Sequence, residues 1–210
     1  MFNTCPGCGQ YSVEKPIDPA GPFAVCPFCG HRHRFLQLPL FVVTGASATG
    51  KTTVCLALQS SLPECVVLEC DVLWRPEFAD PENDYRAFRD VWLRLAKNIG
   101  QAGRPVVLCG SAIPAQYEPC PERRCFSVIH YLALVCDDAE LVRRLEARPG
   151  WRGSSDPTTV ENMLGFNRWL RENAQTTQPP MTLLDTTWLA IDESARRTGN
   201  WVRAHLGGYA

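Results

Sequence analysis

The chain has 210 residues, of which 45% are hydrophobic and 20% charged, a composition typical of a globular protein with a buried core. Its formal net charge of −1 argues against a protein that lives on nucleic acid, because such proteins are usually basic. The apolar runs are only strand-sized, and the first residues lack a basic stretch followed by an apolar run. We therefore expect neither membrane attachment nor a signal peptide.

Eleven cysteines are many for this length, and an odd number without an export signal predicts reduced thiols and a cytoplasmic protein. Cys5 and Cys8 form one Cys-x-x-Cys turn, and Cys26 and Cys29 form a second. Two such turns close a tetrahedral site of four cysteine thiolates, whereas a redox dithiol pair is rarely duplicated. We expect a structural zinc ribbon over residues 1–38, a segment that has few aliphatic residues for a core of its own. Its three basic and two acidic residues do not favour nucleic acid, which leaves stabilisation or docking of a protein partner.

From residue 39 to residue 210, strands alternate with helices, which predicts an α/β domain whose five-stranded parallel sheet has helices on both faces. Strands are expected over residues 39–44, 65–70, 105–109, 128–136 and 181–184. Helices are expected over residues 50–60, 81–101, 139–147, 158–174 and 191–205.

The first predicted strand runs directly into Gly-x4-Gly-Lys-Thr, the pattern of a phosphate loop. Gly45 and Gly50 permit a tight bend that turns backbone N–H groups toward phosphates. Lys51 reaches the β- and γ-phosphates, and Thr52 offers its hydroxyl to Mg²⁺. ATP or GTP and Mg²⁺ are therefore the expected ligands. The predicted nucleotide-binding residues of the loop are Gly45, Ala46, Ser47, Ala48, Thr49, Gly50, Lys51, Thr52 and Thr53.

The segment from residue 38 onward resembles the small P-loop kinases of the adenylate kinase, nucleoside kinase and small-molecule kinase group. The likeness rests on the phosphate loop, on Asp71 after the second strand, on the arginine-bearing segment 141–149, and on Asp185 and Thr186 after the last strand. It implies the three-layer P-loop NTPase sandwich and transfer of the γ-phosphoryl of ATP to a hydroxyl of a nucleoside, nucleotide or other small molecule.

The resemblance also implies roles for particular residues. Arg144 and Arg148 lie four apart on one helix face and would clamp the nucleotide, although Arg148 also reads as an ordinary C-terminal helix charge. Asp185 and Thr186 would border the adenine. A short lid would cover about residues 149–157, with Trp151 and Arg152 as candidate contacts.

Asp71 is expected at the carboxyl edge of the sheet beside the first strand. There it would deprotonate an acceptor hydroxyl or hold Mg²⁺; the alternative is a turn cap. The third strand ends Cys109-Gly110-Ser111, without the acid of a Walker B motif. Mg²⁺ must then rely on Thr52 and Asp71, with Glu69 as a neighbouring carboxylate. The candidate catalytic residues are Lys51, Asp71, Arg144 and Arg148.

The helix expected over residues 81–101 should border the acceptor. Its aromatic residues Tyr85, Phe88 and Trp92 recur at the spacing of a helix face in the core, which favours a core role over a wall that stacks on a base. Its arginines Arg86 and Arg89 could bind an anionic acceptor, but solvated side chains are the more common case. Asn167 lies within an apolar stripe and reads as a satisfied core amide or as a ligand contact.

Two other functions fit parts of the pattern. A polynucleotide 5′-hydroxyl kinase would use the ribbon to hold nucleic acid, but the balanced charge disfavours it. A non-catalytic nucleotide sensor, with the ribbon docking a partner, would explain the missing Walker B acid.

Overall fold

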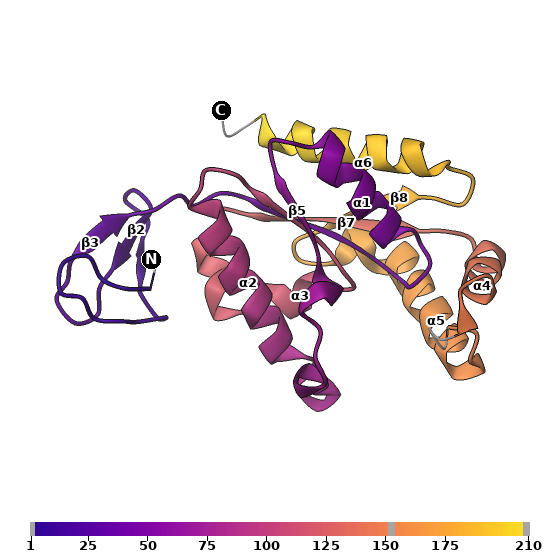
Figure 1. Ribbon diagram of the computed structural model, residues 1–210, viewed down its shortest axis with the longest axis horizontal. Coiled ribbons are helices and arrows are strands. Elements are labelled where there is room, and N and C mark those ends of the chain that lie inside the picture. Colours follow the sequence, from indigo (N-terminus) through magenta and orange to yellow (C-terminus); the bar gives the residue numbers. More distant parts are fainter. Residues whose placement is uncertain (1–2, 151–153, 208–210) are drawn as a thin grey trace.

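The computed structural model describes residues 3–150 and 154–207. Its centre is a five-stranded parallel sheet in the order β5-β6-β4-β7-β8, which confirms the predicted α/β sandwich (Figure 1). The strands are β4 (Leu40–Gly45), β5 (Val66–Glu69), β6 (Val106–Cys109), β7 (Ile129–Val135) and β8 (Met181–Asp185). Each lies within a residue or two of its predicted bounds.

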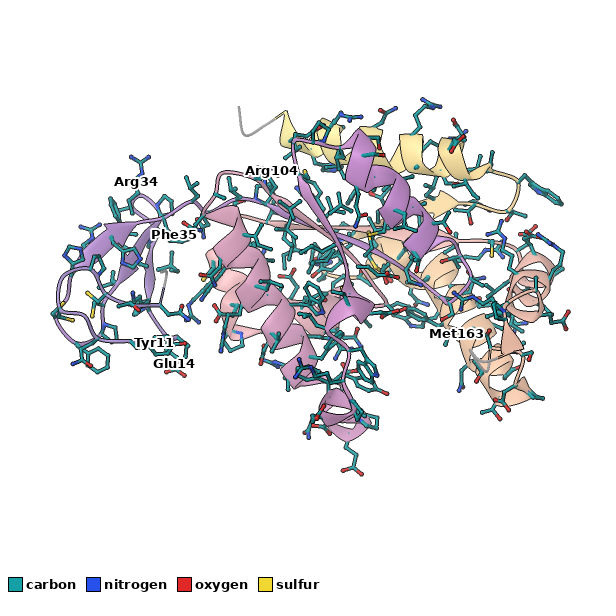
Figure 2. The ribbon with its side chains drawn as sticks, in the orientation of Figure 1. Tyr11, Glu14, Arg34, Phe35, Arg104 and Met163 are labelled. Carbon is teal, nitrogen blue, oxygen red and sulfur yellow. The ribbon has the colours of Figure 1, made fainter. Side chains whose placement is uncertain are left out.

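Helices cover both faces of the sheet because its central strands are apolar on both sides. Phe41 and Val43 of β4 pack with α1 (Lys51–Ser61) and α6 (Ile191–Leu206) on one face, whereas Leu40 and Val42 pack with α2 (Arg86–Gly100) and α5 (Pro157–Asn173) on the other (Figure 1). Met163 of α5 also reaches the phosphate loop (Figure 2). The helices are α1 (Lys51–Ser61), α2 (Arg86–Gly100), α3 (Pro114–Tyr117), α4 (Asp138–Glu146), α5 (Pro157–Asn173) and α6 (Ile191–Leu206).

The helix expected to start at residue 81 begins later, so this boundary was wrong. A short 3-10 turn, η3 (Pro81–Asn83), comes first, and the side chain of Asp80 caps that turn. Asp84 and Tyr85 then adopt left-handed φ angles of 52° and 54°, which breaks the helix before α2 starts.

The order of the strands corrects a second expectation. β6 lies between β5 and β4, so Asp71, which follows β5, is not beside the first strand. It lies instead in η1 (Cys70–Leu73), beyond the outer strand of the sheet. The other 3-10 turns are η2 (Pro76–Phe78), η4 (Pro121–Cys125) and η6 (Ala174–Thr176).

The segment before β4 forms a small antiparallel sheet of β1 (Ile17–Asp18), β2 (Phe23–Val25) and β3 (Arg32–Arg34). This unit, called the ribbon below (residues 3–38), lies beside α2 at one end of the molecule (Figure 1). Phe35 is buried where the ribbon meets the larger fold (Figure 2). Within residues 3–150 and 154–207, none of the helices combines the length and the apolar character that crossing a bilayer requires.

Candidate functional site

The loop between β4 and α1 is shaped by its glycines. Gly45 has a φ of 148°, and a Cβ at this position would lie 2.5 Å from the carbonyl oxygen of Leu134. Gly50 has a left-handed φ of 105° and forms the N-cap of α1. Thr49 tightens the turn by donating its hydroxyl to the carbonyl oxygen of Ala46 at 2.9 Å. The loop thus wraps the N-terminus of α1, where open N–H groups and the helix dipole favour phosphate oxygens.

Lys51 is folded onto this loop. Its ammonium donates to the carbonyl oxygens of Gly45 at 2.7 Å and Ala46 at 2.8 Å. Burial lowers the pKa of Lys51 to about 8, while the charge of Asp71 raises it and that of Arg148 lowers it further. A polyphosphate would add negative charge beside the ammonium and so favour its protonated form.

The end of β6, which lacks a Walker B acid, leaves little room for a side chain at Gly110. A Cβ at Gly110 would lie 2.7 Å from the sulfur of Cys70, so a larger residue does not fit after β6 without a shift. Glu69 supplies a carboxylate from the adjacent strand, where it pairs in register with Cys109. Its Oε1 accepts a 2.6 Å hydrogen bond from the Thr52 hydroxyl. Hydroxyl and carboxylate oxygens suit Mg²⁺, so this donor set fits that ion.

Asp71 follows this pair by two residues and is exposed on the wall of the same cavity. The turn η1 that contains it has no side-chain cap, so the structure does not support the turn-cap alternative. The carboxylate that contacts Thr52 is that of Glu69. A Mg²⁺ role for Asp71 therefore stays a prediction, and its place on the wall also leaves it accessible to an acceptor hydroxyl.

Arg144 joins α4 to the loop that follows β8. Its guanidinium contacts Glu140 at 2.7 Å and donates to the carbonyl oxygen of Thr186 at 2.8 Å. The Thr186 hydroxyl in turn lies 3.2 Å from the carbonyl oxygen of Thr49, which connects this loop to the phosphate loop. Arg148, just beyond the end of α4, is half-buried and lines the cavity.

Asp185, which was also predicted to border the adenine, does not line the cavity. The carboxylate of Asp185 accepts hydrogen bonds from the backbone and hydroxyl of Thr187, so it shapes the turn after β8. The cavity at this edge is lined instead by Trp188, whose side chain is 87% exposed.

These elements surround one open cavity of about 960 Å³. All the predicted nucleotide-binding and catalytic residues line it except Gly45, Ala46 and Asp185. The basic side chains on its wall outnumber the acidic ones, which suits a polyanionic ligand. The basic residues are Lys51, Arg89, Arg143, Arg144 and Arg148, and the acidic residues are Glu69, Asp71 and Glu140. The lid contacts Trp151 and Arg152 lie outside the described residues.

The sequence favours a solvated Arg89 over a binder of an anionic acceptor, and the structure contradicts this favoured interpretation. It is only 7% exposed and lines the cavity. Its spacing of three and four residues from the buried Trp92 and Leu93 places it on the inner face of α2, a signal present in the sequence. Asn167, by contrast, is confirmed as a core amide: it accepts from the N–H of Cys136 and donates to the carbonyl oxygen of the same residue.

A family model described as an AAA domain matches residues 42–161, more than half of the chain. The chain belongs to this AAA-domain family. The matched AAA domain runs from β4 into α5, so it contains the phosphate loop, Glu69, Asp71 and α4. No curated protein matches the sequence.

Solved structures share the fold of this AAA domain at low sequence identity. A sugar kinase from Janibacter sp. is 16% identical with a TM-score of 0.59, covering 79% of this chain and 95% of its own. A gluconokinase from Sinorhizobium meliloti is 18% identical with a TM-score of 0.54, covering 84% and 99%. A shikimate kinase from Acinetobacter baumannii is 20% identical with a TM-score of 0.51, covering 81% and 96%. The fold is therefore that of the P-loop kinases.

The ribbon that precedes the AAA domain holds the four cysteines of the predicted zinc site. The sulfurs of Cys5 and Cys29 are 3.7 Å apart, as are those of Cys8 and Cys26, and all four lie within 4.8 Å of one another. Zinc–sulfur bonds of about 2.3 Å in a tetrahedron require sulfurs about 3.8 Å apart. The four thiols therefore fit a structural zinc ion.

The ribbon is fixed to the AAA domain through a polar interface. Lys97 of α2 is fully buried, and its ammonium contacts Glu122 of η4 at 2.6 Å and the Asn3 side chain at 3.0 Å. Arg124 donates to the carbonyl oxygens of Val13 at 2.9 Å and Lys15 at 3.2 Å. This interface holds the ribbon against α2, the helix that carries Arg89 at the other end.

Proposed function

We propose that this protein is an ATP-dependent kinase that transfers the γ-phosphoryl to a hydroxyl group of a small molecule. The observation that carries the proposal is that one continuous cavity extends from the phosphate loop to the aromatic side chains before and on α2. A nucleotide and an acceptor would therefore share one chamber. The kinase names of the structural neighbours support the same reaction class.

The nucleotide would occupy the end formed by the phosphate loop, α4 and the loop after β8. Lys51 would exchange its contacts with loop carbonyls for phosphate oxygens, and Arg148 would add positive charge on the cavity wall. Thr52 and Glu69, with Asp71 as a further candidate, would hold Mg²⁺, which when bound supplies positive charge to the phosphates.

The acceptor would bind at the end of the cavity that lies beyond Asp71 from the nucleotide. In the transfer, the acceptor oxygen forms a bond to the γ-phosphorus, and the bond between that phosphorus and the bridging oxygen to the β-phosphate breaks. The hydroxyl proton passes to the carboxylate of Asp71, and ADP leaves with the electron pair of the broken bond. Lys51, Arg144 and Arg148 are the residues proposed to stabilise the negative charge during this step.

The ribbon has a structural role in this proposal. Residues 1–38 and 39–210 are proposed as two folding units, with about residues 149–157 as the lid over the nucleotide. Because one side of the ribbon is occupied by α2 and η4, zinc would stabilise a fixed part of the enzyme. Its outer side stays available to a protein partner.

A thermal-shift screen with a non-hydrolysable ATP analogue identifies acceptors, because a true acceptor stabilises the ternary complex. ADP formation with ATP then measures turnover. Lys51→Met and Asp71→Asn are each expected to lower kcat at least about 100-fold. Glu172→Gln, at an exposed position of α5 that does not line the cavity, serves as the matched control and should retain activity. Full turnover in Asp71→Asn would exclude its role as the base.

A further inference from the structure

The acceptor end of the cavity contains a buried positive charge that the proposed phosphoryl transfer does not use. Arg89 projects from the first turn of α2 into the cavity, and its side chain is only 8% exposed. Burying a guanidinium is costly unless its donors are paired with acceptors. The partners of Arg89 therefore indicate whether its role is structural.

Within residues 3–150 and 154–207, the guanidinium has one hydrogen-bond partner, the carboxylate of Asp84 at 3.3 Å. This contact is longer than the 2.7–2.9 Å typical of a charge-assisted hydrogen bond. Asp84 is itself 62% exposed and also accepts from the Gln116 amide at 2.9 Å. A solvated carboxylate that is shared in this way leaves much of the donor capacity of Arg89 unused.

The backbone before Arg89 is held in an unfavourable conformation. Asp84 and Tyr85 are consecutive non-glycine residues with left-handed φ angles, a backbone conformation that is unfavourable for residues with a Cβ. The turn sets Asp84 beside the Arg89 guanidinium and places Tyr85 on the cavity wall, where its ring centroid lies 5.9 Å from that guanidinium. Strain of this kind is concentrated at ligand sites.

Aromatic rings form the wall next to this charge. Trp74 packs against Tyr85 and Phe88, with ring centroids 5.9 Å and 5.3 Å away, and all three line the cavity. The buried Tyr117 lines the cavity too, and its hydroxyl is a further polar group at this end. The site therefore combines a buried cation with an apolar surface.

Arg86, three residues earlier on the same helix, provides the comparison with a structural arginine. It pairs with Asp90 at 3.2 Å, donates to the carbonyl oxygen of Pro119 at 2.9 Å, and does not line the cavity. Its side chain is 40% exposed. Arg89 thus differs from Arg86 in burial, in number of partners and in access to the cavity.

We infer that the acceptor is an alcohol that carries an oxyanion, either a carboxylate or a phosphate monoester, and that Arg89 binds this group while Trp74, Tyr85 and Phe88 contact its apolar part. The inference rests on the proposed kinase function and specifies its substrate class. Asp84 occupies the guanidinium in the absence of the acceptor and competes with the oxyanion.

The test uses matched pairs of anionic and neutral alcohols. Gluconate with glucose and glycerate with glycerol probe the carboxylate, and uridine 5′-monophosphate with uridine probes the phosphate. Each compound is added to the full-length protein saturated with a non-hydrolysable ATP analogue, and the change in Tm is measured. The inference predicts a rise in Tm with the anionic member of at least one pair and none with its neutral partner. The inference would be overturned if only neutral compounds raised the Tm, or if none of the anionic compounds raised it.

Variants separate recognition from structure. Arg89→Gln should abolish the rise in Tm and increase the KM for the anionic acceptor roughly 10- to 100-fold, while Arg86→Gln should leave both unchanged. Asp84→Asn should lower that KM, because it frees the guanidinium; a purely structural ion pair would give no such gain. An unchanged KM in Arg89→Gln contradicts the inference. A wild-type complex that binds an anionic acceptor but forms no ADP from ATP would contradict the kinase proposal instead.

Discussion

The ion pair between Lys97 of α2 and Glu122 of η4 is the most informative place to perturb the base on which the ribbon rests, because Lys97 also contacts Asn3 of the ribbon at 3.0 Å. Both side chains are at least 97% buried, and their charged atoms lie 2.6 Å apart. The nearest additional cation is Arg94, which contacts Glu122 at 3.4 Å and is 46% exposed. Lys97→Met would remove the buried cation, keep most of the packing volume and leave the Glu122 carboxylate with this weaker partner.

Removing one member of a buried ion pair costs about 3–5 kcal/mol, and the remaining contact with Arg94 places the expected loss near the lower value. For a chain of this size, about 3 kcal/mol corresponds to a decrease in Tm of about 6–12 °C. Glu122→Gln should also destabilise the protein, because it removes the carboxylate that the buried Lys97 ammonium contacts at 2.6 Å. The double variant should lose less than the sum of the two single losses, by at least about 1.5 kcal/mol.

Urea unfolding of the four proteins at pH 7 measures these free energies. Arg196→Met, which removes an exposed ion pair with Glu193, is the control and should leave the free energy of unfolding close to that of the wild type. A Lys97→Met protein within 1 kcal/mol of the wild type, or additive losses in the double variant, would refute the reasoning about this interface.

Three further predictions concern Glu69 and Trp188 of the cavity and His130 of β7. Glu69→Gln should raise the Mg²⁺ concentration needed for half-maximal nucleotide binding at least about 10-fold, and an unchanged Mg²⁺ dependence would exclude Glu69 from the metal site. Trp188→Ala should weaken ATP binding several-fold and remove a fluorescence change on binding, because the exposed ring is placed to stack on the base; equal affinity in both proteins would count against stacking. Burial, with a smaller effect of the neighbouring His205, lowers the pKa of His130 to about 4. The unfolded chain then binds more protons between pH 4 and 6.5, so the stability gained from the neutral ring is complete above pH 6.5 and is lost as the pH falls toward 4. His130→Phe should reduce this slope in urea unfolding measured from pH 7 to pH 4.5, whereas an unchanged slope would assign it to other groups.

The features that could be predicted from the sequence depend on local rules. The phosphate loop needs two glycines, a lysine and a threonine at fixed spacing between a strand and a helix, and all of these are adjacent in the chain. The strands are recognisable because they are continuous apolar runs. The cysteine site follows from a duplicated turn whose four ligands share one chemistry.

The features that escaped prediction depend on contacts between distant segments. Glu69 and Thr52 are 17 residues apart and meet only because β5 runs alongside β6, an order that no local pattern encodes. The break before α2 was missed because Asp84 and Tyr85 adopt left-handed backbone angles that glycine usually signals. The buried contact of Lys97 with Glu122 joins residues from separate elements.

The central claim is that one cavity binds ATP and an alcohol and transfers phosphoryl between them. A single-turnover experiment with enzyme in excess over γ-labelled ATP tests it directly, using an acceptor from the thermal-shift screen and Lys51→Met as the inactive control. If the cavity carries out this transfer, the label appears in a phosphate ester of the acceptor, with ADP formed in equal amount. Label that stays in ATP or appears only as inorganic phosphate would contradict it.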